Sequence, residues 1–330
     1  MNISDIAKQI GVSPSMVSRA LNGKKYVNAG KREKILKLME ETGYVPNKAA
    51  RNMVMQRSFT IGIVIPDGFN VFQRQLVSII ERDLCSFDYH TLIFLVKFGS
   101  ASEKDCLDRI KSEKLDGIIM LHEIKSPEFY EYLDKTQLPV ISTACNYNAI
   151  PTVKVDDRLA AFEAINHLIG LGHRKINLIC GDEYSFGKKR AEGYFQALNE
   201  SGIPGENRRV VYVPQYSPES GMYGMRELLL RNRDFTAIFA ASDELALGAM
   251  RTLHDGGIRV PEDISVIGFD DIDIADYLHP RLTTIRQPIR EIGEQSALNL
   301  HRHITGGSAS FQELIIPHKL IVRESTARVS

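Results

Sequence analysis

The sequence predicts a small all-α head followed by a two-lobed α/β body with parallel sheets. Residues 1–60 hold eleven Lys and Arg against four Asp and Glu, a net charge of +7, whereas the rest of the 330-residue chain carries −7. The hydrophobic pattern also changes near Thr60, from helical spacing to short apolar runs that alternate with amphipathic segments. A compact basic head on a mildly acidic body is typical of a protein that binds a polyanion, most commonly nucleic acid.

Two short helices joined by a glycine turn are expected at the start of the head. Gly11 permits the positive φ of a tight turn, and Ser13 followed by Pro14 is a typical helix start. The second helix then runs to about Leu21. The apolar face of the first helix consists of Ile3, Ile6, Ala7 and Ile10.

A helix-turn-helix of this kind places its second helix in the major groove of DNA, with the N-terminal residues toward the bases. Arg19 has the fork geometry for guanine or phosphate, and the small polar side chains suit phosphate contacts. The candidate DNA-contacting residues here are Ser13, Pro14, Ser15, Met16, Ser18, Arg19 and Asn22. A third helix is expected between the N-cap Asn28 and Gly43, with Thr42 as its last residue. The alternative is a helical hairpin with a solvated basic face.

The body reads as strands alternating with helices. Strands are expected at residues 61–65, 91–96, 117–121, 139–143, 153–155, 176–180, 210–213, 237–240 and 265–269, with helices over 72–87 and 102–112 and a final strand within 317–322. Such alternation predicts parallel sheets. About 270 residues are too many for one comfortable sheet, so we expect two open lobes with a ligand cleft at the carboxyl ends of their strands.

The sequence gives no sign of catalysis, metal binding or membrane insertion. There is no HExxH, GxSxG, P-loop or GxGxxG motif, so we predict no catalytic residue and no cofactor. The four cysteines are far apart and are interpreted as buried, inert thiols. His301 and His303 have no metal partners at useful spacing and are expected at the surface. Without an apolar run of ~18 residues or a secretory signal, the protein is expected in the cytoplasm.

Several motifs in the head occur in a recognisable order. They are Asp5-Ile6-Ala7, Gly11-Val12-Ser13, Val17-Ser18-Arg19-Ala20-Leu21-Asn22-Gly23 and Gly43-Tyr44-Val45-Pro46-Asn47-Lys48-Ala49-Ala50-Arg51. Together they resemble the head of the lactose-repressor/galactose-repressor (LacI/GalR) family of regulators. The resemblance implies that Asn47–Met53 is a hinge helix that folds on operator DNA, pairs with its dimer mate and contacts DNA through Asn47, Ala50 and Met53.

The family places a leucine wedge in the minor groove where this chain has Met53. Methionine is also used for such intercalation, although it is more flexible. The alternative is that Met53 is a surface residue of a linker.

The body carries further motifs, which are Val155-Asp156-Asp157, Leu171-Gly172-His173-Arg174-Lys175-Ile176, Arg190-Ala191-Glu192-Gly193-Tyr194, Ser242-Asp243-Glu244-Leu245-Ala246 and Val266-Ile267-Gly268-Phe269-Asp270-Asp271. They are similar to core motifs of the same family. The resemblance implies a periplasmic-binding-protein-like core whose chain crosses between lobes near residues 157, 287 and 315. The predicted domains are a helix-turn-helix domain (1–46), a hinge helix and linker (47–59) and an effector-binding and dimerisation core (60–330). In that core, lobe 1 comprises about 60–157 and 288–314, and lobe 2 about 158–287 and 315–330.

The same resemblance implies an effector site. Arg190 and Asp270 match a ligand arginine and a carboxylate, Ser242 matches a polar position, and Phe72 and Tyr216 match aromatic positions. An arginine–carboxylate pair with flat apolar faces suits a polyhydroxylated ring. Arg190 as a structural ion pair and Tyr216 as a core aromatic are the alternatives.

The predicted function is a transcriptional repressor that binds a palindromic operator as a homodimer and is controlled by a small, sugar-like effector. One departure bears on the effector: Ala144 stands after the strand at 139–143, where many family members have Asp. A regulator that responds to a protein corepressor therefore stays open. A solute-binding module without a DNA role is the remaining alternative.

Overall fold

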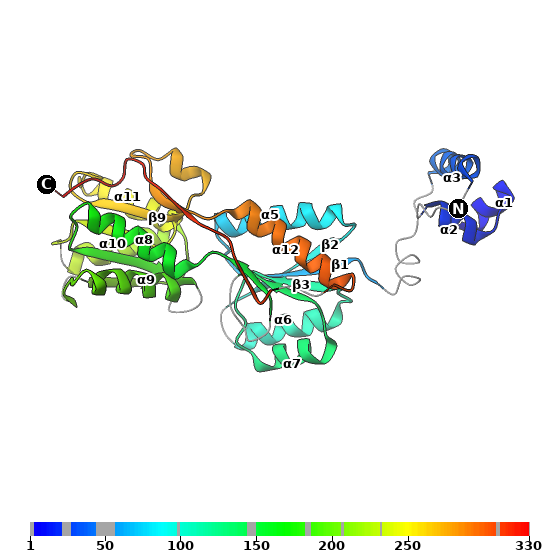
Figure 1. Cartoon of the computed structure of the whole chain (residues 1–330), viewed down its shortest axis with the longest axis horizontal. Helices are drawn as coiled ribbons and strands as arrows, with labels where there is room; N and C mark the ends of the chain where they lie inside the picture. Colours follow the sequence, from blue (N-terminus) through cyan, green and yellow to red (C-terminus); the bar gives the residue numbers. More distant parts are fainter. Residues whose placement is uncertain are drawn as a thin grey trace. The chain divides into compact units, whose positions relative to one another are not determined.

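The computed structural model describes residues 3–21, 28–43, 57–97, 100–143, 150–181, 186–205, 208–231, 233–307 and 311–329. The chain divides into two compact units, Met1–Ser58 and Phe59–Ser330, which we call the head and the body. Both are drawn in Figure 1.

The described part of the head contains the helices α1 (Ile3–Ile10), α2 (Pro14–Leu21) and α3 (Ala29–Thr42). Gly11 adopts φ +69°, and the Val12 N–H donates to the Ala7 carbonyl, which closes the turn between α1 and α2. The Asn28 side chain accepts the Gly30 N–H at the start of α3, and Gly43 ends it in the left-handed conformation. A small core holds the helices together and consists of Ile6, Ala7, Val17, Ala20, Ile35 and Met39.

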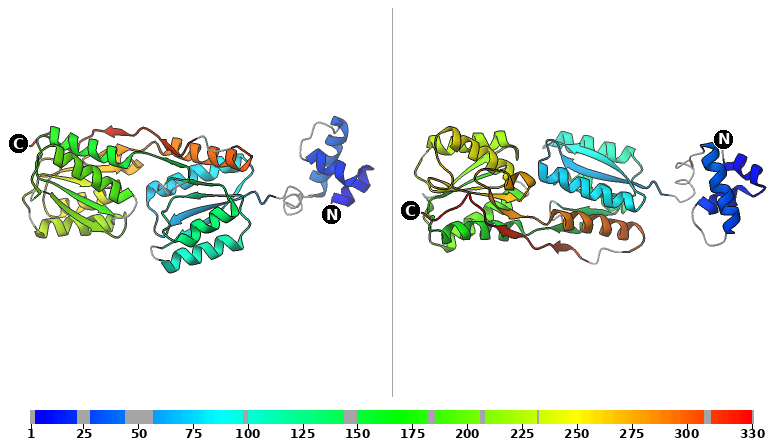
Figure 2. Two further views of the ribbon diagram at one scale, coloured as in Figure 1. Left: turned by 60° about the horizontal axis from the view of Figure 1, so that its bottom comes forward. Right: turned by 90° about the horizontal axis from the view of Figure 1, so that it is seen from above.

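Lobe 1 of the body is a parallel sheet in the order β11-β5-β4-β3-β1-β2. Its elements are β1 (Thr60–Pro66), α5 (Val71–Ser86), β2 (His90–Val96), α6 (Ser100–Ser112), β3 (Gly117–Met120), α7 (Pro127–Thr136), β4 (Val140–Ser142), β5 (Thr152–Lys154), α12 (Ile289–Ile304) and β11 (Glu313–Ile315). Figures 1 and 2 show α5 and α12 on one face and α6 and α7 on the other. Because side chains alternate along a strand, β1 supplies Ile61, Ile63 and Ile65 to the first face and Val64 to the second.

Lobe 2 is a second sheet in the order β12-β10-β9-β8-β6-β7, parallel except for β12. Its elements are α8 (Asp157–Gly170), β6 (Ile176–Gly181), α9 (Phe186–Glu200), β7 (Arg208–Val213), α10 (Pro218–Arg231), β8 (Ala237–Ala240), α11 (Asp243–Asp255), β9 (Ser265–Asp270), the 3-10 helix η2 (Asp273–Asp276), β10 (Thr283–Arg286) and β12 (Lys319–Ile321). Glycine permits the closest helix contact, since a Cβ on Gly248 of α11 would overlap the Pro218 carbonyl of α10.

The chain passes between the two lobes at three places. It leaves lobe 1 between β5 and α8, returns between β10 and α12, and leaves again between β11 and β12. We call these segments, residues 155–156, 287–288 and 316–318, the crossovers. They follow directly after the carboxyl ends of β5, β10 and β11, so residues of both lobes come together near these strand ends.

Two expectations about individual residues are corrected. Cys106 and Cys180 are buried, but Cys85 is exposed, because it lies one residue past the buried Leu84 and so points about 100° away from it around α5; Cys145 lies outside the described residues. His301 and His303 are half-buried instead of lying at the surface, because α12 packs along α5, and the ring of His301 stacks on Phe87 with centroids 4.2 Å apart.

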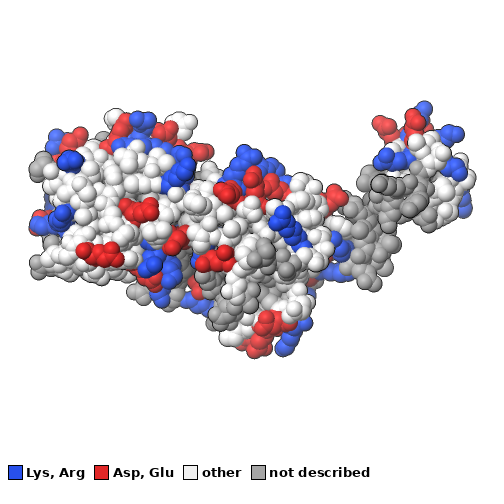
Figure 3. Space-filling view, viewed as in Figure 1, with Lys and Arg blue, Asp and Glu red and all other residues white. Residues whose placement is uncertain are grey.

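Basic and acidic side chains are interspersed over the visible face of the body (Figure 3), without a large area of one sign. Across the described ranges, no helix is long and apolar enough to cross a membrane.

Candidate functional site

The first candidate site is the start of α2 in the head. Ser13, Pro14 and Ser15 are exposed, and Met16 is half-buried. The Ser13 hydroxyl accepts the Met16 N–H at 3.3 Å and lies 2.9 Å from the Ser15 hydroxyl. Pro14 at the first helical position has no N–H to satisfy, so the helix begins with a rigid, exposed turn.

The third helix of the head, α3, is bonded to the C-terminal end of α2. The Arg32 side chain of α3 donates to the Ala20 carbonyl of α2 at 3.3 Å, which ties the two helices together. The side chains of Ser18 and Arg19 on α2 lie outside the described part, as do Asn22, Asn47, Ala50 and Met53.

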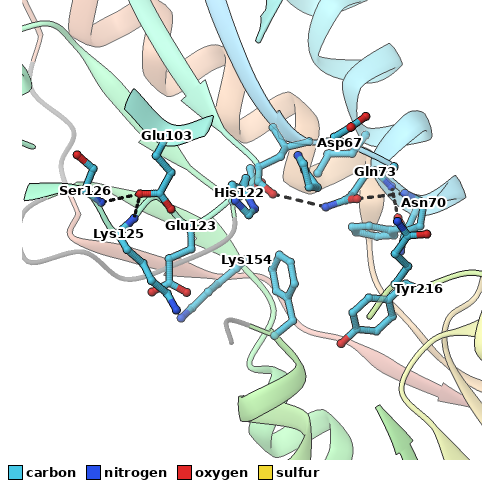
Figure 4. Close-up of a pocket in the computed structure, with 18 of the residues that line it drawn as sticks. Asp67, Asn70, Gln73, Glu103, His122, Glu123, Lys125, Ser126, Lys154 and Tyr216 are labelled. Atoms are coloured by element: carbon cyan, nitrogen blue, oxygen red, sulfur yellow. Dashed lines mark hydrogen bonds between the residues drawn. The ribbon is translucent and has the colours of Figure 1, made fainter. Parts of the chain in front are cut away.

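The second candidate site is a cavity of about 970 Å³ in the body, lined by residues of both lobes (Figure 4). Of the five predicted effector residues, Phe72, Arg190, Tyr216 and Asp270 line it. Lobe 1 supplies side chains from the first turn of α5 and from the segment after β3, and lobe 2 supplies the ends of β9 and α9's first turns.

Arg190 is the centre of a buried ionic network in this cavity. Its Nε donates to Asp157 Oδ1 at 2.8 Å, one terminal nitrogen donates to the Ala241 carbonyl at 2.5 Å and lies 3.7 Å from Asp270 Oδ1. The guanidinium also stacks on the Phe269 ring, 3.6 Å from its centroid. Only 5% of Arg190 is exposed, so these bonds hold it in one orientation while it lines the cavity. Arg190 is thus both a structural ion pair and a cavity residue.

Asp270 lies at the end of β9 in an unusual backbone conformation. Its φ is +116°, and the following Asp271 has φ +57°, which places both outside the region that L-residues prefer. The Asp270 carboxylate accepts the Gln287 amide N–H at 2.7 Å. Burial raises its pKa to about 7, although the nearby Arg190 and the bond from Gln287 act in the opposite direction. Asp270 therefore changes its charge near neutral pH.

The described residues that line the cavity include the aromatic rings of Phe72, Phe186 and Tyr216. Tyr216 lies directly over Gly181 at the end of β6, where any Cβ would overlap its ring. Its hydroxyl is 4.0 Å from the Cys180 sulfur, and burial holds its pKa well above the ordinary value. Flat apolar rings beside a buried arginine and carboxylates suit a ring that carries hydroxyl groups.

The lobe 1 wall is polar and well anchored. The buried Glu103 accepts the backbone N–H groups of Lys125 and Ser126 at 3.0 and 2.7 Å, which fixes the segment between β3 and α7 (Figure 4). His122 lies on this segment, and burial, with Lys125 nearby, lowers its pKa to about 4. The His122 imidazole is therefore neutral at neutral pH and adds a polar but uncharged group to the wall.

Ser242 is the exception among the predicted effector residues. It is not among the described residues that line the cavity. Its hydroxyl accepts the Leu245 N–H at 3.1 Å and so caps the N-terminus of α11, and its residue is 1% exposed. A serine hydroxyl that can bind a ligand can equally well accept a backbone N–H at a helix start. In this structure the Ser242 hydroxyl has the second role.

The cavity also contains residues that were not predicted as site residues. Asp157 and Gln287 hold Arg190 and Asp270, and Phe186 adds an aromatic face. Asp157 lies within the motif Val155-Asp156-Asp157, directly after a strand, and that position was the available signal. Among the described residues, no group of His, Cys, Asp or Glu is arranged to hold a metal ion.

Comparisons with known proteins agree over both units. Residues 2–47 match the family described as bacterial regulatory proteins, lacI family, and residues 165–326 match a periplasmic binding protein-like domain. The chain is 32% identical to catabolite control protein A of Priestia megaterium over 330 residues, with 99% of each chain covered.

Two solved structures are similar as well. The lac repressor dimer bound to operator and the anti-inducer ONPF has a TM-score of 0.88 at 26% identity, with 99% of each chain covered. A LacI family regulator from Enterococcus faecium with bound ribose has a TM-score of 0.74 at 32% identity and covers 82% of this chain and 100% of its own. This chain therefore belongs to the lacI family of bacterial regulatory proteins, which are DNA-binding regulators and not enzymes.

Proposed function

We propose that this protein is a transcriptional repressor that binds a palindromic operator as a homodimer and is controlled by a small, sugar-like effector in the body cavity. Each head reads one half-site, and two subunits match the two halves. Because its target is DNA, the protein acts in the cytoplasm.

The DNA contacts are assigned to the start of α2 and to the segment after the head. The major groove is contacted by Ser13, Pro14, Ser15, Met16, Ser18, Arg19 and Asn22. The minor groove is contacted by Asn47, Ala50 and Met53. The exposed, rigid turn at Ser13–Ser15 supports this assignment. Binding through several phosphates predicts an affinity that falls steeply as salt increases.

The effector assignment depends on one observation, the buried network of Arg190 and Asp270 beside aromatic rings. A guanidinium has five N–H donors, of which the Asp157 and Ala241 bonds use two. The others are suited to ligand hydroxyls, and Phe72 and Tyr216 are suited to the apolar faces of a sugar ring. The ribose-bound relative supports the choice of ligand class.

A thermal-shift screen of the full-length protein against sugars, sugar phosphates and nucleobases tests the effector assignment. A ligand at 100 to 1,000 times its Kd stabilises the protein by roughly 2.7–4.1 kcal/mol. We expect one sugar-like compound to shift the wild-type protein but not the Asp270→Ala variant, and to change its affinity for operator DNA. If no compound shifts the wild type, a small effector is refuted, and a protein corepressor becomes the remaining candidate.

A further inference from the structure

The first turn of α5 is completed by a side chain from the other lobe. Asn70 and Gln73 cap each other's backbone N–H groups at 2.9 and 3.1 Å, so two donors of this helix end are satisfied inside lobe 1. The next donor, the Val71 N–H, is bound by Glu244 Oε2 of lobe 2 at 2.8 Å. The hydrogen bonding of α5 therefore depends on where lobe 2 lies.

Glu244 also lies in the first turn of its own helix, α11, which begins at Asp243. Its carboxylate thus stands between the N-termini of two helices, one from each lobe. Each N-terminus carries a partial positive charge of roughly half an elementary charge, so the two ends repel each other and both attract an anion. The Glu244 side chain is 12% exposed, and little water screens these interactions.

The lobes approach closely at a second point beside this one. Gly68, in the segment before α5, lies against Gln215 of lobe 2, and a Cβ at residue 68 would be 3.4 Å from the Gln215 side-chain nitrogen. Gly68 has φ +81°, a conformation that favours glycine. Gly68 and Gln215 both line the cavity. The contact between the lobes is therefore a wall of the cavity.

We propose that Glu244 is a latch that holds the two lobes in the arrangement seen here by binding the N-terminus of α5 beside the cavity. The crossovers fix the lobes to each other through the chain, and the latch fixes them where the N-termini of α5 and α11 meet. Arg74, whose guanidinium is 4.0 Å from Glu244, is 55% exposed and contributes little.

A consequence for regulation rests on the proposed function. Because the bond between Glu244 and the Val71 N–H joins the lobes beside the cavity, the latch opposes any separation of the lobes by which an effector enters or leaves. The latch itself depends on the geometry of the lobes alone, and it is tested without any effector.

The experiment measures the distance between spin labels on the two lobes of the full-length protein. Cysteines replace Lys135 on α7 and Arg251 on α11, both well exposed, in a background in which Cys85 and Cys145 are serine. Labelled chains are mixed with an excess of unlabelled chains, so that each labelled chain reports one distance. Three variants are compared with the parent: Glu244→Ala, Glu244→Gln and the control Glu219→Ala, which removes an exposed acid from the neighbouring α10.

We expect one narrow distance distribution in the parent and in Glu219→Ala. Glu244→Ala should add a second population and change the ratio of the two arrangements on the order of tenfold, as the loss of a charge-assisted bond does. Glu244→Gln keeps an oxygen that accepts the Val71 N–H but loses the charge, so its effect should be intermediate. Identical distributions in the parent and in Glu244→Ala would overturn the latch, and so would an equal change in Glu219→Ala.

Discussion

Replacing Asp270 by asparagine is expected to make the stability of the protein less dependent on pH. Burial raises the pKa of Asp270 from 3.8 to about 7 in the folded protein. Between these two values the folded state holds a proton that the unfolded state has released. The proton-linked stability is therefore complete below pH 4 and is lost as the pH rises through 7.

The size of this effect follows from the difference between the two pKa values. At roughly 1.4 kcal/mol for each pKa unit, a difference of about three units corresponds to about 4 kcal/mol. Asparagine has nearly the same shape, its oxygen still accepts the Gln287 N–H, and it never ionises. The full effect builds up between pH 4 and pH 8. Between pH 5 and pH 8, about two of the three pKa units are crossed, so the free energy of unfolding of Asp270→Asn, measured relative to wild type, should rise by about 3 kcal/mol.

The assay is urea denaturation of both proteins at pH 5 and pH 8, at one protein concentration because unfolding of the proposed homodimer depends on concentration. Asp263→Asn is the control. Hydrogen bonds from Arg259 lower the pKa of the exposed Asp263 to about 2, so its folded and unfolded values both lie below pH 5. The free energy of unfolding of Asp263→Asn relative to wild type should be the same at both pH values. If the free energy of unfolding of Asp270→Asn relative to wild type is also the same at pH 5 and pH 8, the burial argument is refuted.

Three further predictions concern the head, the cavity and the lobe 2 core. Arg19→Ala should weaken operator binding by about 1–3 kcal/mol and relax base preference, measured by fluorescence anisotropy; unchanged affinity would contradict the position of α2 in the groove. Gly181→Ala should displace the Tyr216 ring and weaken effector binding on the order of tenfold with little change in operator affinity, because the added Cβ overlaps that ring. Gly248→Ala should lower the free energy of unfolding by about 3 kcal/mol in urea titrations, because its Cβ overlaps the Pro218 carbonyl, and a neutral result would show that the helices separate easily.

The fold was predictable where single residues mark the ends of elements. Asn28 and Gly43 gave the bounds of α3, because an N-cap and a left-handed glycine act locally. The buried strands of the body were found from their apolar runs. The short strands β10 and β11 were missed, since β10 is half threonine and the apolar residues at β11, Leu314, Ile315 and Ile316, are too few to mark a strand.

The site was predictable only in part, for a different reason. Arg190 and Asp270 could be named from their motifs, but their partners Asp157 and Gln287 are 130 residues apart in sequence, and only the fold brings both to the cavity. Ser242 caps α11 in this structure, and the sequence does not show whether a hydroxyl points to a ligand or to its own helix. The sequence likewise does not show which side of a helix faces the core, and Cys85, which was expected to be buried, is exposed.

The position of the ionic network explains how binding in the cavity could act on the whole body. Asp157 begins α8 directly after the first crossover, and Gln287 belongs to the second. Both are bonded to the residues proposed to hold the effector, Arg190 and Asp270. An effector that bonds to Arg190 or Asp270 therefore alters hydrogen bonds at the crossovers, the segments that connect the lobes. Because packed lobes move as rigid bodies, a small change there becomes a larger displacement far from the cavity.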